Sequence, residues 1–151
     1  MKLTIRRILL ADEPFLREML YHALYVPEGA PPFPRAIVQQ PEIRQYVQDW
    51  GQPDDAGLLA LIDSEPVGAV WIRRIQAYGF VHDDTPELSV AMLSEYRGKG
   101  LGTKLMKELL VLLQTRYAAI SLSVSKANPA LRLYERLGFE IVKDDGNSVT
   151  M

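Results

Sequence analysis

The sequence predicts a mixed α/β domain, and three observations support this prediction. Short apolar segments with strand-like patterning alternate with segments whose apolar residues recur at helical spacing. The 151 residues suffice for one domain with a buried core, and 48% are hydrophobic and 24% charged, as in ordinary soluble proteins. No internal repeat or linker divides the chain, so we expect one domain over residues 1–151.

The first half of the chain predicts a strand, two helices and an antiparallel pair of strands. These elements are expected at residues 2–9, 12–25, 41–50, 57–63 and 67–73. Asp12 is suited to cap the first helix, with Pro14 in its first turn. Between the two helices, the segment VPEGAPPFPR (26–35) contains four prolines and a glycine, which predicts a loop.

The second half predicts a strand, a helix, a strand, a short helix and a closing antiparallel pair. The strands are expected at residues 87–93 and 118–124, the helix from 101 onward, the short helix at 128–138, and the pair at 139–142 and 147–151. In the short helix, Asn128 is placed to cap, Pro129 comes first, and Gly138 ends the helix.

Composition and charge exclude several classes of function. The formal net charge of −2 argues against binding to duplex nucleic acid, which usually requires a basic face. The chain has no cysteine, and its two histidines, His22 and His82, are too few for a histidine-rich metal site. No apolar run reaches the ~20 residues that span a bilayer, and the N-terminus lacks the pattern of a secretory signal. We therefore expect a cytoplasmic protein that binds no metal, nucleic acid or membrane.

The segment YRGKGLGTKL (96–105) places three glycines at alternate positions directly ahead of a predicted helix. A glycine costs ~1 kcal/mol relative to alanine inside regular structure, so this spacing indicates that the backbone itself has a function. Glycines let successive N–H groups converge on an anion, and a helix N-terminus adds about half a positive charge. With Arg97, Lys99 and Lys104 nearby, the pattern predicts a phosphate site.

Two common nucleotide motifs do not fit this segment. A P-loop requires GxxxxGK followed by Ser or Thr, and the chain contains no such string. A dinucleotide-binding fingerprint requires GxGxxG in an early βαβ unit, whereas this string is GxGxG and lies late in the chain. A tight strand-to-helix turn without a ligand is the structural alternative, although one glycine normally suffices for such a turn.

The string RGxGxG after the strand ELSVAML closely resembles the acyl-CoA pyrophosphate loop of the GNAT superfamily of N-acetyltransferases. The later segment SLSVSKANPALRLYERLGF resembles the second CoA-side segment of that family, and the two matches span residues 87–140. The resemblance implies the GNAT acyl-CoA N-acyltransferase fold, with a central, mostly antiparallel sheet flanked by helices. It also implies acetyl-CoA, or coenzyme A after transfer, as co-substrate.

The resemblance further implies which residues hold CoA. Backbone N–H groups at the glycine segment would hold the pyrophosphate, and the preceding strand would splay from its neighbour beside the thioester, with the Met92 N–H as oxyanion donor. Ser94 stands where many members have proline, which should matter little because these contacts are main-chain. The implied cofactor-binding residues are Met92, Leu93, Arg97, Gly98, Lys99, Gly100, Leu101, Gly102, Thr103 and Asn128.

Two residues are candidates for catalysis. Tyr134 lies six residues after Asn128, matching the NPAxxLY pattern of the family, which implies that Tyr134 donates a proton to the departing thiolate. A core aromatic on an apolar helix face is the alternative for Tyr134. Glu87, at the start of the strand, could take the proton of the amine directly or through water, especially if burial raises its pKa. His82 has the more suitable ordinary pKa but sits in the loop HDDT, so Glu87, His82 and water all stay open as the base.

The expected function is transfer of an acetyl group from CoA to a primary amine by direct attack in a ternary complex. The acceptor is a small molecule or a peptide, and Phe33 and residues 78–80 are candidates for the wall of its pocket. A non-catalytic, CoA-binding module that retains the glycine loop is the alternative. The sequence leaves a homodimer open.

Overall fold

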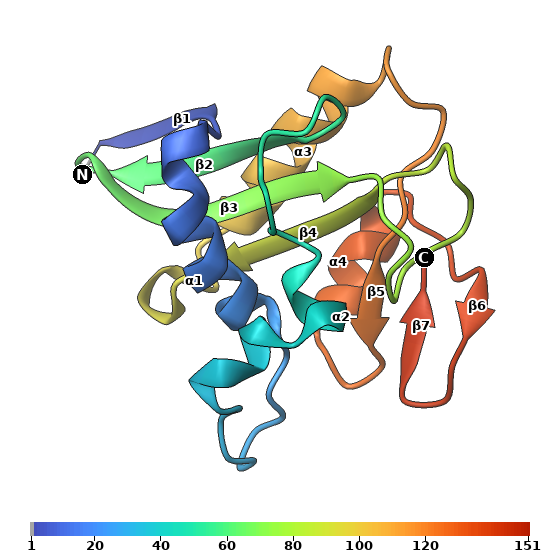
Figure 1. Ribbon diagram of the computed structural model, residues 1–151. Helices are drawn as coiled ribbons and strands as arrows, with labels where there is room; N and C mark the ends of the chain where they lie inside the picture. The colour runs from blue at the N-terminus through green and yellow to red at the C-terminus, as the bar shows by residue number, and fades with distance from the viewer. Residues whose placement is uncertain (1) are drawn as a thin grey trace.

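The computed structural model describes residues 2–151, and the order of its elements confirms the mixed α/β prediction (Figure 1). The strands are β1 Leu3–Arg7, β2 Ala56–Ile62, β3 Glu65–Arg73, β4 Glu87–Met92, β5 Ser123–Ser125, β6 Lys143–Asp144 and β7 Ser148–Thr150. The helices are α1 Glu13–Ala23, α2 Pro41–Arg44, α3 Leu101–Leu113 and α4 Ala130–Arg136.

The first four strands form an antiparallel sheet in the order β1-β2-β3-β4. The predicted hairpin is confirmed: β2 and β3 are joined by a tight turn in which Asp63 (φ 49°) and Ser64 (φ 73°) both adopt the left-handed conformation. Such positive φ values match the turn to the right-handed twist of the two strands. The last three strands form a separate small sheet in the order β5-β7-β6.

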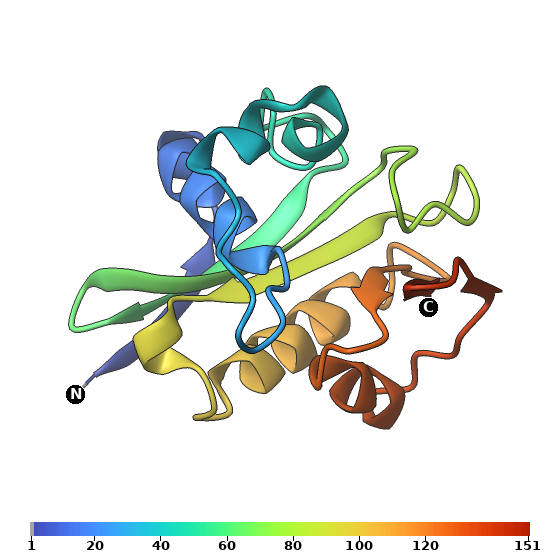
Figure 2. The same cartoon turned by 90° about the horizontal axis from the view of Figure 1, so that it is seen from below.

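Helices cover both faces of the four-stranded sheet, which makes three layers (Figure 2). Alternating side chains on β2 and β3 divide between the two faces, as pleated strands require. Leu59 and Trp71 pack on the α1 side with Leu16, whereas Val70 packs on the α3 side with Leu105. Because both faces are buried, these strands are apolar throughout rather than alternately polar.

The two sheets meet at a single parallel bridge between Glu87 and Ser121. The Leu88 N–H donates to the Ser121 carbonyl at 2.7 Å, and the Ser121 N–H donates to the Pro86 carbonyl at 3.0 Å. After this bridge β4 and β5 no longer pair, and β5 continues in the small sheet beside β7. The predicted strand at 118–124 is therefore wrong over most of its length, and only the part from Ser123 onward is strand.

The predicted helix at 41–50 ends as α2 at Arg44, because a tertiary contact interrupts it. The Arg73 guanidinium donates to the carbonyls of Gln45, Gln48 and Asp49, and it also forms an ion pair with Asp55. These contacts hold residues 45–49 in turns against the sheet.

Two further predictions are corrected. The Asp12 side chain does not cap α1; its carboxylate instead accepts hydrogen bonds from the Arg6 guanidinium and the Leu9 N–H. The strand predicted at 139–142 lies further along the chain, as β6, and it pairs antiparallel with β7 as expected.

The C-terminal end of α4 forms as predicted. Gly138 (φ 101°) adopts the left-handed conformation, and the Phe139 N–H donates to the Tyr134 carbonyl at 3.0 Å, as in a glycine-ended helix.

Candidate functional site

The edge of β4 that faces away from β3 has unpaired backbone groups. The Leu93 N–H donates to the Val67 carbonyl at 2.8 Å on the β3 side. Backbone groups alternate in direction along a strand, so Ala91 also faces β3, and Val90 and Met92 turn their N–H and C=O groups to the opposite edge. Since β5 has diverged after the Ser121 bridge, no strand of residues 2–151 pairs with this edge along Val90 and Met92, and of these groups only the Met92 carbonyl has a partner there, the Arg97 side chain.

The glycine segment follows β4 after one 3-10 turn and leads into α3. Gly98 (φ 73°) and Gly100 (φ 80°) adopt the left-handed conformation that disfavours other residues, and Gly102 lies in the first turn of α3. A Cβ atom placed on Gly98 or Gly100 would meet no protein atom within 4 Å. The backbone here is thus exposed to open space rather than packed against the protein.

The amide N–H groups from Gly98 to Thr103 have no hydrogen-bond acceptor within residues 2–151. The first N–H of this region that is paired belongs to Lys104, which donates to the Gly100 carbonyl at 3.1 Å. Consecutive free amides at the start of a 13-residue helix attract an anion, because the helix dipole adds positive potential there. The segment therefore fits a phosphate group.

A cavity of about 750 Å³ lies between these amides, the open edge of β4 and the start of α4. The predicted cofactor residues that line it are Met92, Arg97, Gly98, Gly100, Leu101, Gly102, Thr103 and Asn128. Two predicted residues lie outside it. The backbone of Leu93 is occupied by Val67 and by the Tyr96 N–H, and the Lys99 ammonium lies over the Tyr96 ring, 5.5 Å from its centroid.

The Arg97 side chain ties the glycine segment to α1 rather than extending into solvent. Its Nε donates to the Met92 carbonyl at 3.2 Å, and its Nη2 donates to the His22 carbonyl at 3.1 Å. The guanidinium thus fixes one wall of the 750 Å³ cavity and leaves its positive charge close to the free amides.

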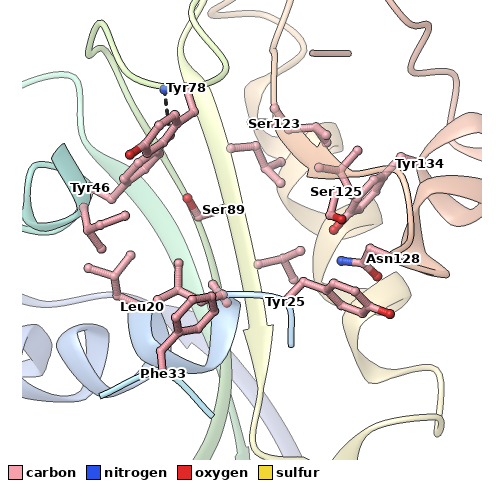
Figure 3. Close-up of a pocket in the computed structure, with 17 residues that line it drawn as sticks. Leu20, Tyr25, Phe33, Tyr46, Tyr78, Ser89, Ser123, Ser125, Asn128 and Tyr134 are labelled. Carbon is pink, nitrogen blue, oxygen red and sulfur yellow. Dashed lines mark hydrogen bonds between the residues drawn. The ribbon is translucent and has the colours of Figure 1, made fainter. Parts of the chain in front are cut away.

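A second cavity, of about 260 Å³, lies along the earlier part of β4, from Leu88 to Val90, where the chain of β5 is close (Figure 3). The two cavities share Ala23, Leu24, Tyr25, Phe33, Val90, Asn128 and Tyr134. The smaller cavity is further lined by Leu20, Ile43, Tyr46, Tyr78, Leu88, Ser89, Leu122, Ser123, Val124 and Ser125. Because they share a wall, ligands in the two cavities would meet near Val90 and Tyr134.

Tyr134 lies at this junction, on α4. Its side chain is buried and packs edge-on against Phe139, with ring centroids 6.2 Å apart. Burial raises the pKa of the Tyr134 hydroxyl to about 12, so that it keeps its proton at neutral pH. It can therefore act as a proton donor there, but not as a base.

Glu87 does not line either cavity, and its side chain is only 1% exposed. Its carboxylate accepts three hydrogen bonds: from the Ala77 N–H at 2.8 Å, the Gly79 N–H at 2.7 Å and the Tyr46 hydroxyl at 3.1 Å. Burial raises the pKa of Glu87, and the three donors oppose that rise by stabilising the charged form. A carboxylate that accepts three donors is expected to be ionised at neutral pH.

Tyr46 connects this carboxylate to the smaller cavity, which it lines. Its hydroxyl donates to Glu87 and accepts from the Tyr78 N–H at 3.2 Å, and burial, with the negative charge of Glu87, raises the pKa of Tyr46. No sequence pattern indicates this contact, because Tyr46 precedes Glu87 by 41 residues and falls at an ordinary apolar position of the predicted helix. Val90 was missed for a related reason: only the divergence of β4 and β5 exposes its backbone.

His82 lies apart from both cavities. Its side chain is 68% exposed and its Nδ1 accepts from the Asp84 N–H at 3.1 Å, which is a local loop contact. Among residues 2–151, no group of three or more His, Asp or Glu side chains is arranged to hold a metal ion. No helix in the described part of the chain has the length and apolarity needed to cross a membrane.

Comparisons with known proteins agree with this geometry. The model of the acetyltransferase (GNAT) family matches residues 16–139. An N-alpha-acetyltransferase of Saccharolobus solfataricus is 36% identical over 110 residues, covering 66% of this chain and 63% of that protein. An N-alpha-acetyltransferase of Sulfurisphaera tokodaii is 33% identical over 109 residues, covering 65% of this chain and 64% of that protein. The matched part thus spans less than two thirds of the length of either relative.

Solved structures show the same fold at low sequence identity. The crystal structure of a PaiA N-acetyltransferase from Thermoplasma acidophilum in complex with coenzyme A has a TM-score of 0.69 and 20% identity, and covers 100% of this chain and 98% of that one. The ribosomal-protein-S18-alanine N-acetyltransferase from Escherichia coli has a TM-score of 0.69 and 18% identity, covering 99% and 92%. The glycine loop, the divergent strands and the family match lead to one conclusion: the chain belongs to the GNAT family of acetyltransferases.

Proposed function

We propose that the protein transfers an acetyl group from acetyl-CoA to a primary amine by direct attack within a ternary complex. The observation that carries this proposal is the shared wall of the two cavities at Val90, Asn128 and Tyr134. Two substrates that meet at one wall can react without a covalent enzyme intermediate, because their alignment supplies much of the rate. The names of the curated relatives support the α-amine of a polypeptide as the acceptor.

In this proposal, backbone groups bind the CoA co-substrate. The free N–H groups from Gly98 to Thr103 donate hydrogen bonds to the pyrophosphate. On the open edge of β4, the N–H and C=O of Val90 and the N–H of Met92 pair with the amides of the pantetheine arm, since the Met92 carbonyl already accepts from Arg97. Asn128 is compatible with a contact to that arm, although its Oδ1 already accepts from the Ala130 N–H at 2.9 Å. Leu93 and the Lys99 side chain make no direct contact with CoA in this proposal, because the backbone of the first is occupied and the second lies over Tyr96.

The oxyanion that develops on the thioester carbonyl needs a fixed donor. The N–H groups of Val90 and Met92 both face the open edge, and Val90 lies at the wall that the two cavities share. We therefore add the Val90 N–H to the Met92 N–H as a candidate oxyanion donor. A backbone donor of this kind contributes ~3–4 kcal/mol to transition-state stabilisation in well-studied acyl transfer.

The proton of the ammonium substrate leaves through Tyr46 to Glu87. Glu87 itself does not reach the cavity, but Tyr46 lines it, and the Tyr46 hydroxyl donates a hydrogen bond to Glu87. As the ammonium gives a proton to the Tyr46 oxygen, the hydroxyl proton passes to the Glu87 carboxylate. His82 is disfavoured as base because it is exposed and outside the cavity.

The neutral amine then attacks the thioester carbon, and the carbon–sulfur bond breaks as the tetrahedral intermediate collapses. Tyr134 gives its proton to the departing thiolate and regains one from the nitrogen, which loses a proton as the amide forms. With a pKa of about 12 the Tyr134 hydroxyl is protonated over the whole neutral range, as a proton donor must be.

The experiment that tests the proposal measures free thiol release from acetyl-CoA with a panel of amines and short peptides. The expected result is release that depends on the amine and exceeds hydrolysis without amine. A protein that binds CoA in calorimetry but releases no thiol with any acceptor would instead be the non-catalytic CoA-binding module.

A further inference from the structure

The cavity on the acceptor side contains no charged side chain. Its polar lining groups are hydroxyls of Tyr and Ser and one Asn, and its other lining residues are apolar. At about 260 Å³ it falls just below the usual ~300–1,000 Å³ of ligand cavities, so it accommodates one small group beside the amine.

Glu87 is the carboxylate behind this cavity, and donors of the protein already occupy it. Both of its oxygens accept hydrogen bonds from donors of the protein, and its side chain is 1% exposed. It can receive one proton through Tyr46, but it offers no contact to a second cation. A second positive charge in the cavity would lose its water without gaining an anionic partner, which is costly.

Aromatic side chains from separate segments form the outer wall. Phe33 comes from the proline-rich loop, Tyr46 follows α2, and Tyr78 belongs to the loop between β3 and β4 (Figure 3). Phe33 and Tyr78 are 39% and 55% exposed, so an apolar group that enters between them would cover surface that now faces water.

The wall is held in place before any ligand arrives. The Phe33 carbonyl accepts from the Tyr21 hydroxyl at 2.6 Å, and the Tyr46 carbonyl accepts from the Trp71 Nε1 at 2.9 Å. The Tyr78 N–H is bound by the Tyr46 hydroxyl. Since the backbone that carries these aromatic side chains is anchored, rejection of a second charge does not depend on a rearrangement of the loops.

We propose that the acceptor is an amine with a single positive charge and a small uncharged apolar group next to it, and that amines with a second charge are rejected. For a peptide acceptor, this means an apolar first residue rather than Lys, Asp or Glu. The inference rests on the proposed function and adds the substrate class to it.

The test compares matched amines with the wild-type protein. Pentylamine and putrescine have the same chain length and differ in a terminal methyl or ammonium group. We expect kcat/KM, measured by thiol release, to be at least ~100-fold lower for putrescine, as for a buried charge without a partner. Peptides that begin with Met or with Glu provide the same comparison for a negative charge. Equal or faster turnover of putrescine would overturn the inference and leave the proposed function intact.

A variant pair sharpens the test. Phe33→Glu places a carboxylate at the mouth of the cavity, and Phe33→Gln provides the same shape without the charge; the exposed position tolerates both. Only Phe33→Glu should lower the ratio of kcat/KM for pentylamine to kcat/KM for putrescine. The expected change is about fivefold, as for a partly exposed ion pair. An unchanged ratio in Phe33→Glu contradicts the placement of this cavity as the acceptor site.

If no amine is turned over, the proposed function fails, and binding still decides the inference. Calorimetry of the CoA-saturated protein should then detect pentylamine and not putrescine. Binding of putrescine that equals or exceeds that of pentylamine would overturn the inference in that case as well.

Discussion

The two sides of the site are built by different means. The cofactor side relies on consecutive backbone groups, the free amides from Gly98 to Thr103 and the open edge of β4. The acceptor side relies on side chains, Phe33, Tyr46 and Tyr78, from three segments that lie far apart in the sequence. Backbone recognition tolerates changes of side chain but not of backbone conformation, whereas the acceptor wall should respond in the opposite way. The two sides are therefore expected to fail differently when mutated.

The largest effect is expected from Gly100→Val. Gly100 has φ 80°, so valine there is strained, and its side chain would enter the open space beside the amides. Loss of about two charge-assisted hydrogen bonds corresponds to a ~10²–10⁴-fold loss of CoA affinity. Calorimetric titration with CoA measures this.

Gly146→Val is the matched control for Gly100→Val. Gly146 has φ 98°, and a Cβ there also meets no protein atom within 4 Å, but it lies in the turn between β6 and β7 and lines neither cavity. It should lose similar stability and keep its CoA affinity. If a folded Gly100→Val protein binds CoA as tightly as this control, the amides do not hold the pyrophosphate.

Tyr134→Phe tests the point where the two sides meet. The substitution removes only the hydroxyl, and the buried ring still packs against Phe139. We expect kcat to fall by ~10²–10⁴ with nearly unchanged CoA affinity, as for loss of a general acid. Tyr117→Phe, which removes a hydroxyl that donates to the Asp54 carbonyl outside both cavities, should keep kcat. A wild-type rate in Tyr134→Phe would make Tyr134 a packing residue.

Glu87→Gln tests whether the buried carboxylate behind the acceptor cavity takes the proton of the amine. The neutral side chain cannot accept from Ala77, Gly79 and Tyr46 together, so we expect a loss of ~1–3 kcal/mol in the free energy of unfolding and a lower rate at neutral pH. The rate should partly recover at higher pH, where more of the amine is already neutral. His82→Ala should change the same pH profile less.

The direction of the Glu87 pKa shift predicts the wild-type profile. Since burial raises this pKa, kcat/KM should fall on the acidic side of its pH profile at a pH above the ordinary Glu pKa of ~4.3. The same shift makes the free energy of unfolding fall as the pH rises. The stabilisation by Glu87 is full below ~4.3 and is lost as the pH passes through the raised pKa. Tyr46→Phe distinguishes proton transfer through Tyr46 from a purely structural role of Glu87, because it leaves the Ala77 and Gly79 N–H contacts of Glu87 intact. If Tyr46→Phe preserves both the rate and the acidic side of the pH profile, the proton takes another path.

The cofactor side of the site could be predicted from the sequence better than the acceptor side, because only the cofactor side is built from local segments. The glycine segment, β4 and the helix with Asn128 and Tyr134 are local patterns, so their positions could be inferred before the fold was known. The path from Glu87 to Tyr46 required the fold, since it joins residues 41 positions apart. The end of α2 at Arg44 was unpredictable for the same reason, because the Arg73 contacts that stop it come from β3.

The smallest effect is expected from Lys99→Ala, although Lys99 sits in the middle of the glycine segment. Its ammonium lies over the ring of the half-buried Tyr96, and Lys99 itself does not line the 750 Å³ cavity, so its charge acts on a bound phosphate without direct contact. An exposed charge of this kind contributes ~0.2–1 kcal/mol, which corresponds to less than about a fivefold loss of CoA affinity. The effect should shrink further at high salt, because exposed charges are screened. Calorimetry at low and high salt, with Gly100→Val as the opposite extreme, measures how far the backbone alone holds the cofactor. A loss as large as that of Gly100→Val would mean that side chains, and not amides, hold the phosphate, and the contrast between the two sides of the site would disappear.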